Sequence, residues 1–277
     1  MRRVTPACGN KSPNPGARAC VDSNARSNQG TALDVSGTGR EVNVKAVLSV
    51  VVLLASAGTA GAGWSECSHR SPREATVEAN GARRVRVIAR AGDLKIQGRL
   101  GVSTVAVHGT ACASRESGLD EIKLIAERRG DEIYVEAAMS DEWFGGARGL
   151  DLTIEVPSSL PLEVDDGSGS ADIRDVAALK IEDGSGDLRI ENVAGEVRVT
   201  DGSGGIVIDH AGSVVIDEDG SGGVRITDVK GSVVVRDDGS GSIDVTDVGG
   251  DFAVEHDGSG GITHDGVRGT VRIPRRR

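Results

Sequence analysis

Six aspartates that each precede a Gly-Ser-Gly turn are the residues whose type and spacing could support chemistry. They recur about every 18 residues, as Asp166, Asp183, Asp201, Asp219, Asp238 and Asp257. If successive copies stack, these carboxylates form a column along one edge, where like charges repel and a calcium ion would relieve the repulsion. Aspartate and glycine also serve to cap the backbone amides of a sharp turn. The spacing therefore allows two interpretations, calcium ligands or turn caps.

The calcium interpretation can be compared with the β-rolls of repeats-in-toxin proteins. Their nonapeptide repeat places the aspartate after its glycines, in the order Gly-Gly-x-Gly-x-Asp. In this chain the aspartate comes before the first glycine, and the period is longer. The sequence favours turn caps exposed to solvent, so the six aspartates remain weak calcium candidates and no metal site is assigned.

Enzyme classes find little support in the other residues. The serine of the repeated turn does not belong to a Gly-x-Ser-x-Gly nucleophile elbow. The five histidines show no metal-ligand spacing; they are His69, His108, His210, His256 and His264. A net charge of −10 has the wrong sign for a nucleic-acid partner. We expect a protein that is not an enzyme, with no catalytic residues and no cofactor.

The residues between the turns predict the elements that would hold the aspartates. Each repeat has two short runs in which β-branched or other apolar residues alternate with polar ones, as in Leu188/Ile190 and Val197/Val199. A period of two predicts strands with one buried face. One repeat cannot bury that face alone, but stacked copies would place Leu188 next to Ile206, Val224 and Ile243. We predict an all-β, two-walled β-solenoid with parallel sheets and rungs of about 18 residues, nine or ten rungs over residues 82–273.

Two further columns follow from the same stacking. A second corner carries mixed polar residues, namely Asp175, Asn192, His210, Asp228 and Asp247. One outward column is mixed in sign; it runs Asp172, Arg189, Val207, Arg225, Asp244 and Thr263. An outward face of this kind suits a polar partner better than lipid.

Composition divides the chain into segments. Residues 1–44 read as a disordered extension or a start codon assigned too early, because they are rich in Asn, Ser, Gly, Pro and Arg without apolar period. The remaining boundaries are a signal peptide at 45–62, a linker at 63–81, degenerate rungs at 82–164, the regular solenoid at 165–274 and a basic tail at 275–277. For residues 82–164, an antiparallel cap packed on the solenoid is the alternative.

The segment at 45–62 predicts export. Lys45 precedes an apolar run and small residues that end at Ala62, which is typical of a cleaved secretory signal. Cleavage would leave no membrane span and only two cysteines, Cys67 and Cys112. A pair of cysteines in an oxidising compartment predicts a disulfide, with two isolated thiols as the alternative. The expected location is the periplasm or the cell surface.

The repeated units of the form DGSGxIxIxDVxGxVxV carry a family resemblance, together with GDLKIQG at 92–98 and LDLTIEVPSSLPLEV at 150–164. Over about Ala82 to Ile273 the chain resembles the putative adhesin domain family of bacterial envelope proteins. The resemblance implies an exported β-solenoid without catalytic residues. It suggests an adhesin-like interaction or scaffold role toward an envelope protein, a polysaccharide or another copy of itself. The alternative function is a calcium-responsive acidic solenoid.

Overall fold

The computed structural model describes residues 67–139 and 147–274, all within the second of two compact units, Ala60–Arg277. These residues form one sheet system of 18 strands with a single 3₁₀ helix, η1, at Glu116–Glu121. The strands are β1 His69–Glu78, β2 Arg84–Ile88, β3 Leu94–Arg99, β4 Thr104–Ala113, β5 Ile122–Arg129, β6 Glu132–Met139, β7 Arg148–Pro157, β8 Leu162–Asp166, β9 Ala171–Arg174, β10 Leu179–Asp183, β11 Leu188–Asp201, β12 Ile206–Asp219, β13 Gly222–Val229, β14 Val233–Asp238, β15 Gly241–Val248, β16 Phe252–Asp257, β17 Gly260–Asp265 and β18 Val271–Arg272.

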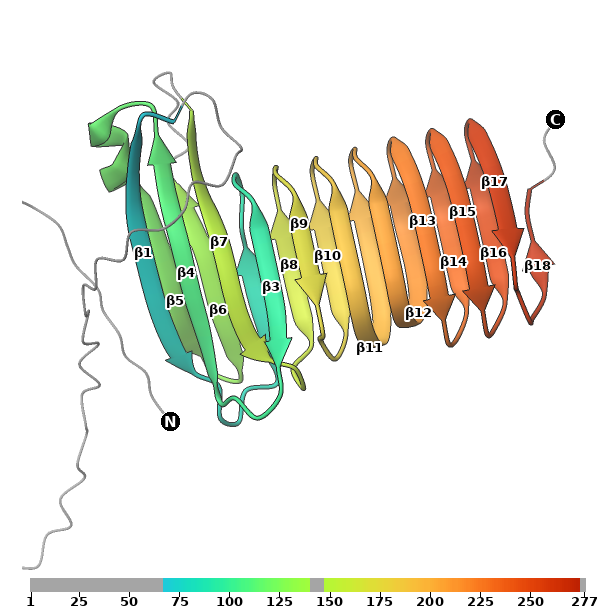
Figure 1. The fold of residues 1–277 in the computed structure, drawn as a ribbon, viewed down its shortest axis with the longest axis horizontal. Helices are drawn as coiled ribbons and strands as arrows, with labels where there is room; N and C mark the ends of the chain where they lie inside the picture. Colours follow the sequence, from blue (N-terminus) through green and yellow to red (C-terminus); the bar gives the residue numbers. More distant parts are fainter. Residues whose placement is uncertain (1–66, 140–146, 275–277) are drawn as a thin grey trace, which may run out of the picture. The chain divides into compact units, whose positions relative to one another are not determined.

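The C-terminal part is the predicted two-walled solenoid of parallel strands (Figure 1). One wall contains β8, β10, β14, β16 and β18 with the C-terminal halves of β11 and β12. The facing wall contains β9, β13, β15 and β17 with the N-terminal halves of the same two strands. The two walls form because the period-two alternation gives every strand one apolar face, which packs into the interior between the walls.

The predicted interior stack is confirmed in register. Leu188 pairs with Ile206, Ile206 with Val224, and Val224 with Ile243. All four are at most 1% exposed. The six Gly-Ser-Gly turns give six regular rungs, fewer than the nine or ten expected, because the chain before residue 162 follows another path.

The segment between residues 82 and 164 differs from the expected run of rungs in sequence order. The β2–β3 unit is a true rung, since β2 pairs in parallel with β8 and β3 with β9. On its other side lie β6 and β7, which come later in the chain. Figure 1 shows β3 between β7 and the first regular rungs. The pairs β1–β4, β4–β7 and β5–β6 are antiparallel, which agrees with the alternative prediction of an antiparallel cap for residues 82–164.

The cap is tied together by long-range contacts. Cys67 and Cys112 are joined by a disulfide, with their Cα atoms 5.7 Å apart. Arg73 on β1 donates hydrogen bonds to the carbonyl oxygens of Ile122 and Leu119, at 3.2 and 2.8 Å. These contacts hold β1 against β5 and η1, at the end of the sheet system farthest from β18 (Figure 1).

Some sequence predictions fall outside the described residues. They are the extension at 1–44, the signal peptide at 45–62 and the basic tail at 275–277. Among residues 67–139 and 147–274, no helix has the length and apolar character needed to cross a membrane.

Candidate functional site

The repeated aspartates form a column, and the column lies inside the solenoid. Asp183 pairs in register with Asp166 and with Asp201, and the pairing continues through Asp219 and Asp238 to Asp257. The first five are only 1 to 6% exposed. The expectation of a solvent-exposed acidic edge is therefore wrong for these five carboxylates.

A signal for this orientation is present in the sequence. In Val197, Val199 and Asp201 the spacing of two residues continues from the inward valines to the aspartate, which puts the carboxylate on the buried face. In the next rung one extra residue separates Ile216 from Asp219. The structure absorbs it as a register shift between β11 and β12, with Val199 opposite Ile216 and Asp201 opposite Asp219. The irregularity keeps the aspartate inward.

The surroundings of the column are almost entirely apolar. Within the described part of the chain, the only buried polar or charged residues are these five aspartates, so no buried basic side chain neutralises them. Neither carboxylate oxygen of any of the five accepts a well-formed hydrogen bond. Facing them, the first inward residues after each turn are aliphatic: Ala171, Leu188, Ile206, Val224 and Ile243.

Burial changes the acidity of these groups. The pKa of Asp166 is raised to about 7 and that of Asp183 to about 6, first by loss of hydration and second by the neighbouring carboxylate one rung away. The pKa of Asp219 rises to about 7 for the same first reason, assisted by Asp238. Burial also raises the pKa of Asp201 and Asp238. At Asp166, Asp183, Asp201 and Asp219, turn amides act in the opposite direction and lower the pKa, without cancelling the effect of burial.

The opposite corner carries the second predicted column. Its residues adopt a left-handed backbone with φ between 54 and 58°: Asp175, Asn192, His210, Asp228 and Asp247. Asn, Asp and His are the types that tolerate this conformation best after glycine, which explains their recurrence at this corner. His210 lies between carboxylates, with Nδ1 3.0 Å from Asp209 and Nε2 3.0 Å from Asp228.

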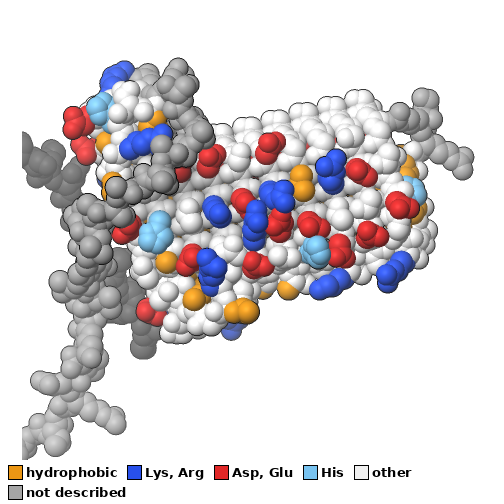
Figure 2. All heavy atoms as spheres, viewed as in Figure 1, with side chains coloured by type: hydrophobic (Ala, Val, Ile, Leu, Met, Phe, Trp, Pro, Cys, Tyr) orange, Lys and Arg blue, Asp and Glu red, His pale blue; other side chains and the backbone are white. Residues whose placement is uncertain are grey.

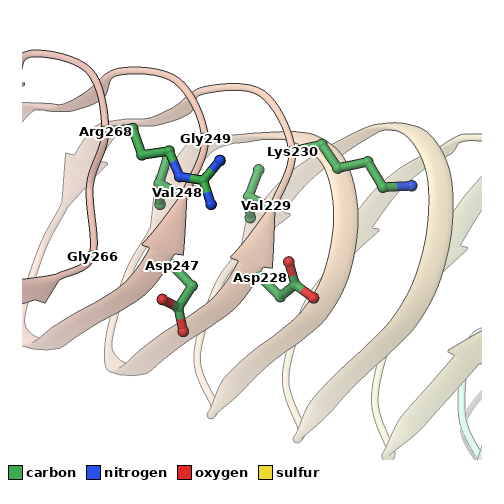
Figure 3. A pocket seen from close by; sticks show the side chains of 8 residues that line it. All are labelled: Asp228, Val229, Lys230, Asp247, Val248, Gly249, Gly266 and Arg268. Atoms are coloured by element: carbon green, nitrogen blue, oxygen red, sulfur yellow. The ribbon is translucent and has the colours of Figure 1, made fainter.

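A groove of about 260 Å³ opens at this corner near the last rungs (Figure 3). It is lined by Asp228, Val229, Lys230, Asp247, Val248, Gly249, Gly266 and Arg268. Figure 3 shows the carboxylates of Asp228 and Asp247 on one side, whereas Lys230 extends away from them. Its lining carries charged groups of both signs, with Asp228 and Asp247 on one side and Lys230 and Arg268 among the other residues. Sequence reasoning identified the corner but not the groove, because the groove depends on how three rungs stack.

The outward faces carry ladders of opposite charges. Arg198 lies 2.9 Å from Asp217 in the next rung, and Asp217 also pairs with Arg236 one rung further. On the other wall, Arg225 lies 3.8 Å from Asp244. Figure 2 shows red and blue side chains interspersed over one face, while one rim is almost free of them, as glycine and serine turns require. The pair Arg225–Asp244 belongs to the predicted outward column of mixed sign, whereas the ladder of Arg198, Asp217 and Arg236 lies on the other wall and was not predicted.

The histidines are not brought together. His108 lies 3.6 Å from Glu74 in the cap, and His264 packs against Phe252 with ring centroids 6.0 Å apart. In the described ranges, no group of three or more His, Cys, Asp or Glu side chains is arranged to hold a metal ion.

Known proteins resemble this chain in structure rather than in sequence. No family model and no curated protein matches the sequence. A putative adhesin from Bacteroides fragilis is similar in structure, with a TM-score of 0.41 and 12% identity over 76% of this chain and 100% of that chain. A putative adhesin from Parabacteroides merdae has a TM-score of 0.32 and 12% identity, over 75% of this chain and 97% of that chain. A putative lipid binding protein from Parabacteroides distasonis has a TM-score of 0.37 and 11% identity, over 75% of this chain and 98% of that chain.

Proposed function

We propose that this chain is an exported, non-catalytic protein of the cell envelope that binds a polar partner along the outside of its solenoid. The observation that carries the proposal is the ladder of paired charges, in which Arg198, Asp217 and Arg236 come from three successive rungs. Such ladders hold charged groups at a regular spacing of about 4.8 Å. A partner with repeated polar groups, such as a polysaccharide, matches this spacing along several rungs.

Export is the second part of the proposal. It rests on the secretory pattern at 45–62 and on the Cys67–Cys112 disulfide, since disulfides persist in oxidising compartments. We expect the mature protein to begin at Gly63, after cleavage at Ala62. N-terminal sequencing of the protein from fractionated cells checks this. A cytoplasmic protein that begins at Met1 would contradict both the signal and the role in the envelope.

The partner proposal can be tested by removing one ion pair of this ladder. The double variant Arg198→Ala/Asp217→Ala keeps the net charge and removes a pair whose atoms lie 2.9 Å apart. We expect it to bind purified envelope polysaccharide at least about fivefold more weakly, because an outward pair that contacts a ligand contributes more than a free surface pair. Binding is measured by titration at constant salt.

The matched control is Arg83→Ala/Asp131→Ala, which removes an exposed pair of 3.7 Å in the turns next to β2 and β6. It should bind like the unchanged protein. Equal binding by all three proteins would place the partner elsewhere. Sedimentation velocity of the same samples distinguishes a polysaccharide partner from self-association, which would appear without added polymer.

A further inference from the structure

The interior aspartates pose a problem of charge that the fold must solve. Five carboxyl groups stand one above the other at the spacing of the rungs, about 4.8 Å, in a space that is 1 to 6% exposed. Ionised carboxylates so close together and out of water repel strongly. On the cap side the column ends at Ala89, whose amide donates a hydrogen bond to the carbonyl oxygen of Asp165 at 2.9 Å. Ala89 is 3% exposed and carries no charge, so the side chain at this position does not neutralise Asp166.

The charged groups around the column are themselves acidic. On the strands that carry it, the outward neighbours are Asp165 on β8, Glu182 on β10, Glu218 on β12 and Asp237 on β14. From the turn between β2 and β3, Asp93 adds to the negative field at Asp166. At the far end, Asp257 and its neighbour His256 lie on β16. Arg90, whose backbone lies against Gly167 in the turn after Asp166, directs its side chain to Glu136, at 3.6 Å.

A metal ion is poorly suited to relieve this repulsion. Calcium requires six to eight oxygens around it, in part from backbone carbonyls. Here the turn carbonyls already accept hydrogen bonds along the stack: Asp183 from the amide of Gly202 and Ser203 from the amide of Gly186. The opposite wall offers aliphatic side chains. A proton, by contrast, needs no cage and turns the contact between two carboxylates into a hydrogen bond.

We propose that the interior aspartate column is a proton-binding site, in which carboxylic acids donate to carboxylates one rung away and so hold adjacent rungs together. The lack of a basic side chain and of a well-formed hydrogen bond at the carboxylate oxygens of these five aspartates supports this, because the side chain next to each carboxyl in the column is another carboxyl. When the pH rises, the protons leave, the carboxylates repel and the stack loosens. The inference does not depend on which partner the outer face binds.

The acidity of the column sets the range of pH. The folded protein retains protons on Asp166, Asp183 and Asp219 up to a pH of about 6 to 7, since their pKa values are raised, whereas the unfolded chain loses them near 3.8. Between these limits the folded state binds more protons than the unfolded state. Stability from these groups is therefore full below about pH 4, falls as pH rises and is lost above about pH 7. Asp219 and Asp238 contact each other and titrate as a pair.

The test compares melting temperatures between pH 5.5 and 8.5 for the full chain and two triple variants. Asp166→Asn/Asp183→Asn/Asp219→Asn removes the three interior carboxyls whose pKa values are raised to about 6 or 7, with almost no change in shape. Asp165→Asn/Glu182→Gln/Glu218→Gln changes the adjacent exposed residues and replaces the same number of carboxyl groups. We expect the unchanged protein and the exposed variant to lose about 5 °C or more as the pH rises, and the interior variant to lose about 1 °C.

Three readings decide the outcome. An equal loss in all three proteins would overturn the proposal, as would a melting temperature that rises with pH. A rise of more than about 1 °C on adding millimolar calcium at pH 8, absent in the interior variant, would show that a metal ion is the ligand instead. The infrared band of protonated carboxyl groups, present at pH 6 and reduced in the interior variant, would show the protons directly.

Discussion

Replacing Gly222 by alanine should destabilise the protein by about 3 kcal/mol or more, which corresponds to roughly 6 to 12 °C in melting temperature. Gly222 has a φ of 148°, a conformation that residues with a side chain rarely adopt. A Cβ atom there would lie 1.6 Å from the carbonyl oxygen of Gly204 in the preceding rung. Neither backbone can withdraw, because the amide of Gly222 also donates to the carbonyl of Ser240 in the following rung.

The neighbouring glycine provides the matched control. At Gly223 an added Cβ would meet nothing nearer than the Ser242 hydroxyl, at 3.6 Å, and the side chain would point outward. Gly223→Ala should change the melting temperature by less than about 2 °C. Thermal unfolding followed by circular dichroism compares the two. If Gly222→Ala were as stable as Gly223→Ala, the close stacking of the turns would be incorrect.

A charge in the aliphatic stack should have an effect of similar or larger size. Val224→Asp places a carboxylate at a position that is 1% exposed, between Ile206 and Ile243, and should cost about 4 kcal/mol or more. The chain tolerates Asp219 in the interior because that carboxyl has other carboxyls above and below to share a proton. Val224 has only hydrocarbon neighbours, so an aspartate there has no such partner.

Arg225→Ala is the control for this substitution. Its side chain is 68% exposed and its ion pair with Asp244 is weak, so we expect less than about 1 kcal/mol. Chemical denaturation measures the free energy of unfolding of both variants. A Val224→Asp protein that unfolds at the same denaturant concentration as Arg225→Ala would mean that the inward and outward faces are exchanged.

The repeat and its alternation predicted the solenoid because both are local signals. Each regular rung contains its own strands and turns, and each contacts the next one along the chain. The order of the first rungs, by contrast, depends on pairings between residues far apart in the chain. Val85 pairs with Leu162, which lies far later in the chain, and no pattern near Val85 indicates that register. The similarity of GDLKIQG to a later repeat identified β3 as part of a rung, but not its neighbours.

The candidate site was only partly predictable. The column of aspartates follows from spacing alone, whereas its orientation depends on how many residues separate each aspartate from the last inward residue of its strand. That separation is two residues before Asp183 and Asp201 and three residues before Asp219 and Asp238. An Asp-Gly-Ser-Gly sequence also suggests a surface turn, and only the outer Gly-Ser-Gly part is on the surface. The proton-binding site was missed for this reason.

The way in which rungs contact only their neighbours has a consequence for how the protein can change over generations. Gain or loss of one repeat in the gene would lengthen or shorten the stack by about 4.8 Å without disturbing β1 to β7. The unequal intervals between successive Asp-Gly-Ser-Gly turns show that rungs of slightly different length fit into the same stack. The number of repeats thus sets the length of the solenoid, and a change in that number leaves the strands of the cap the same.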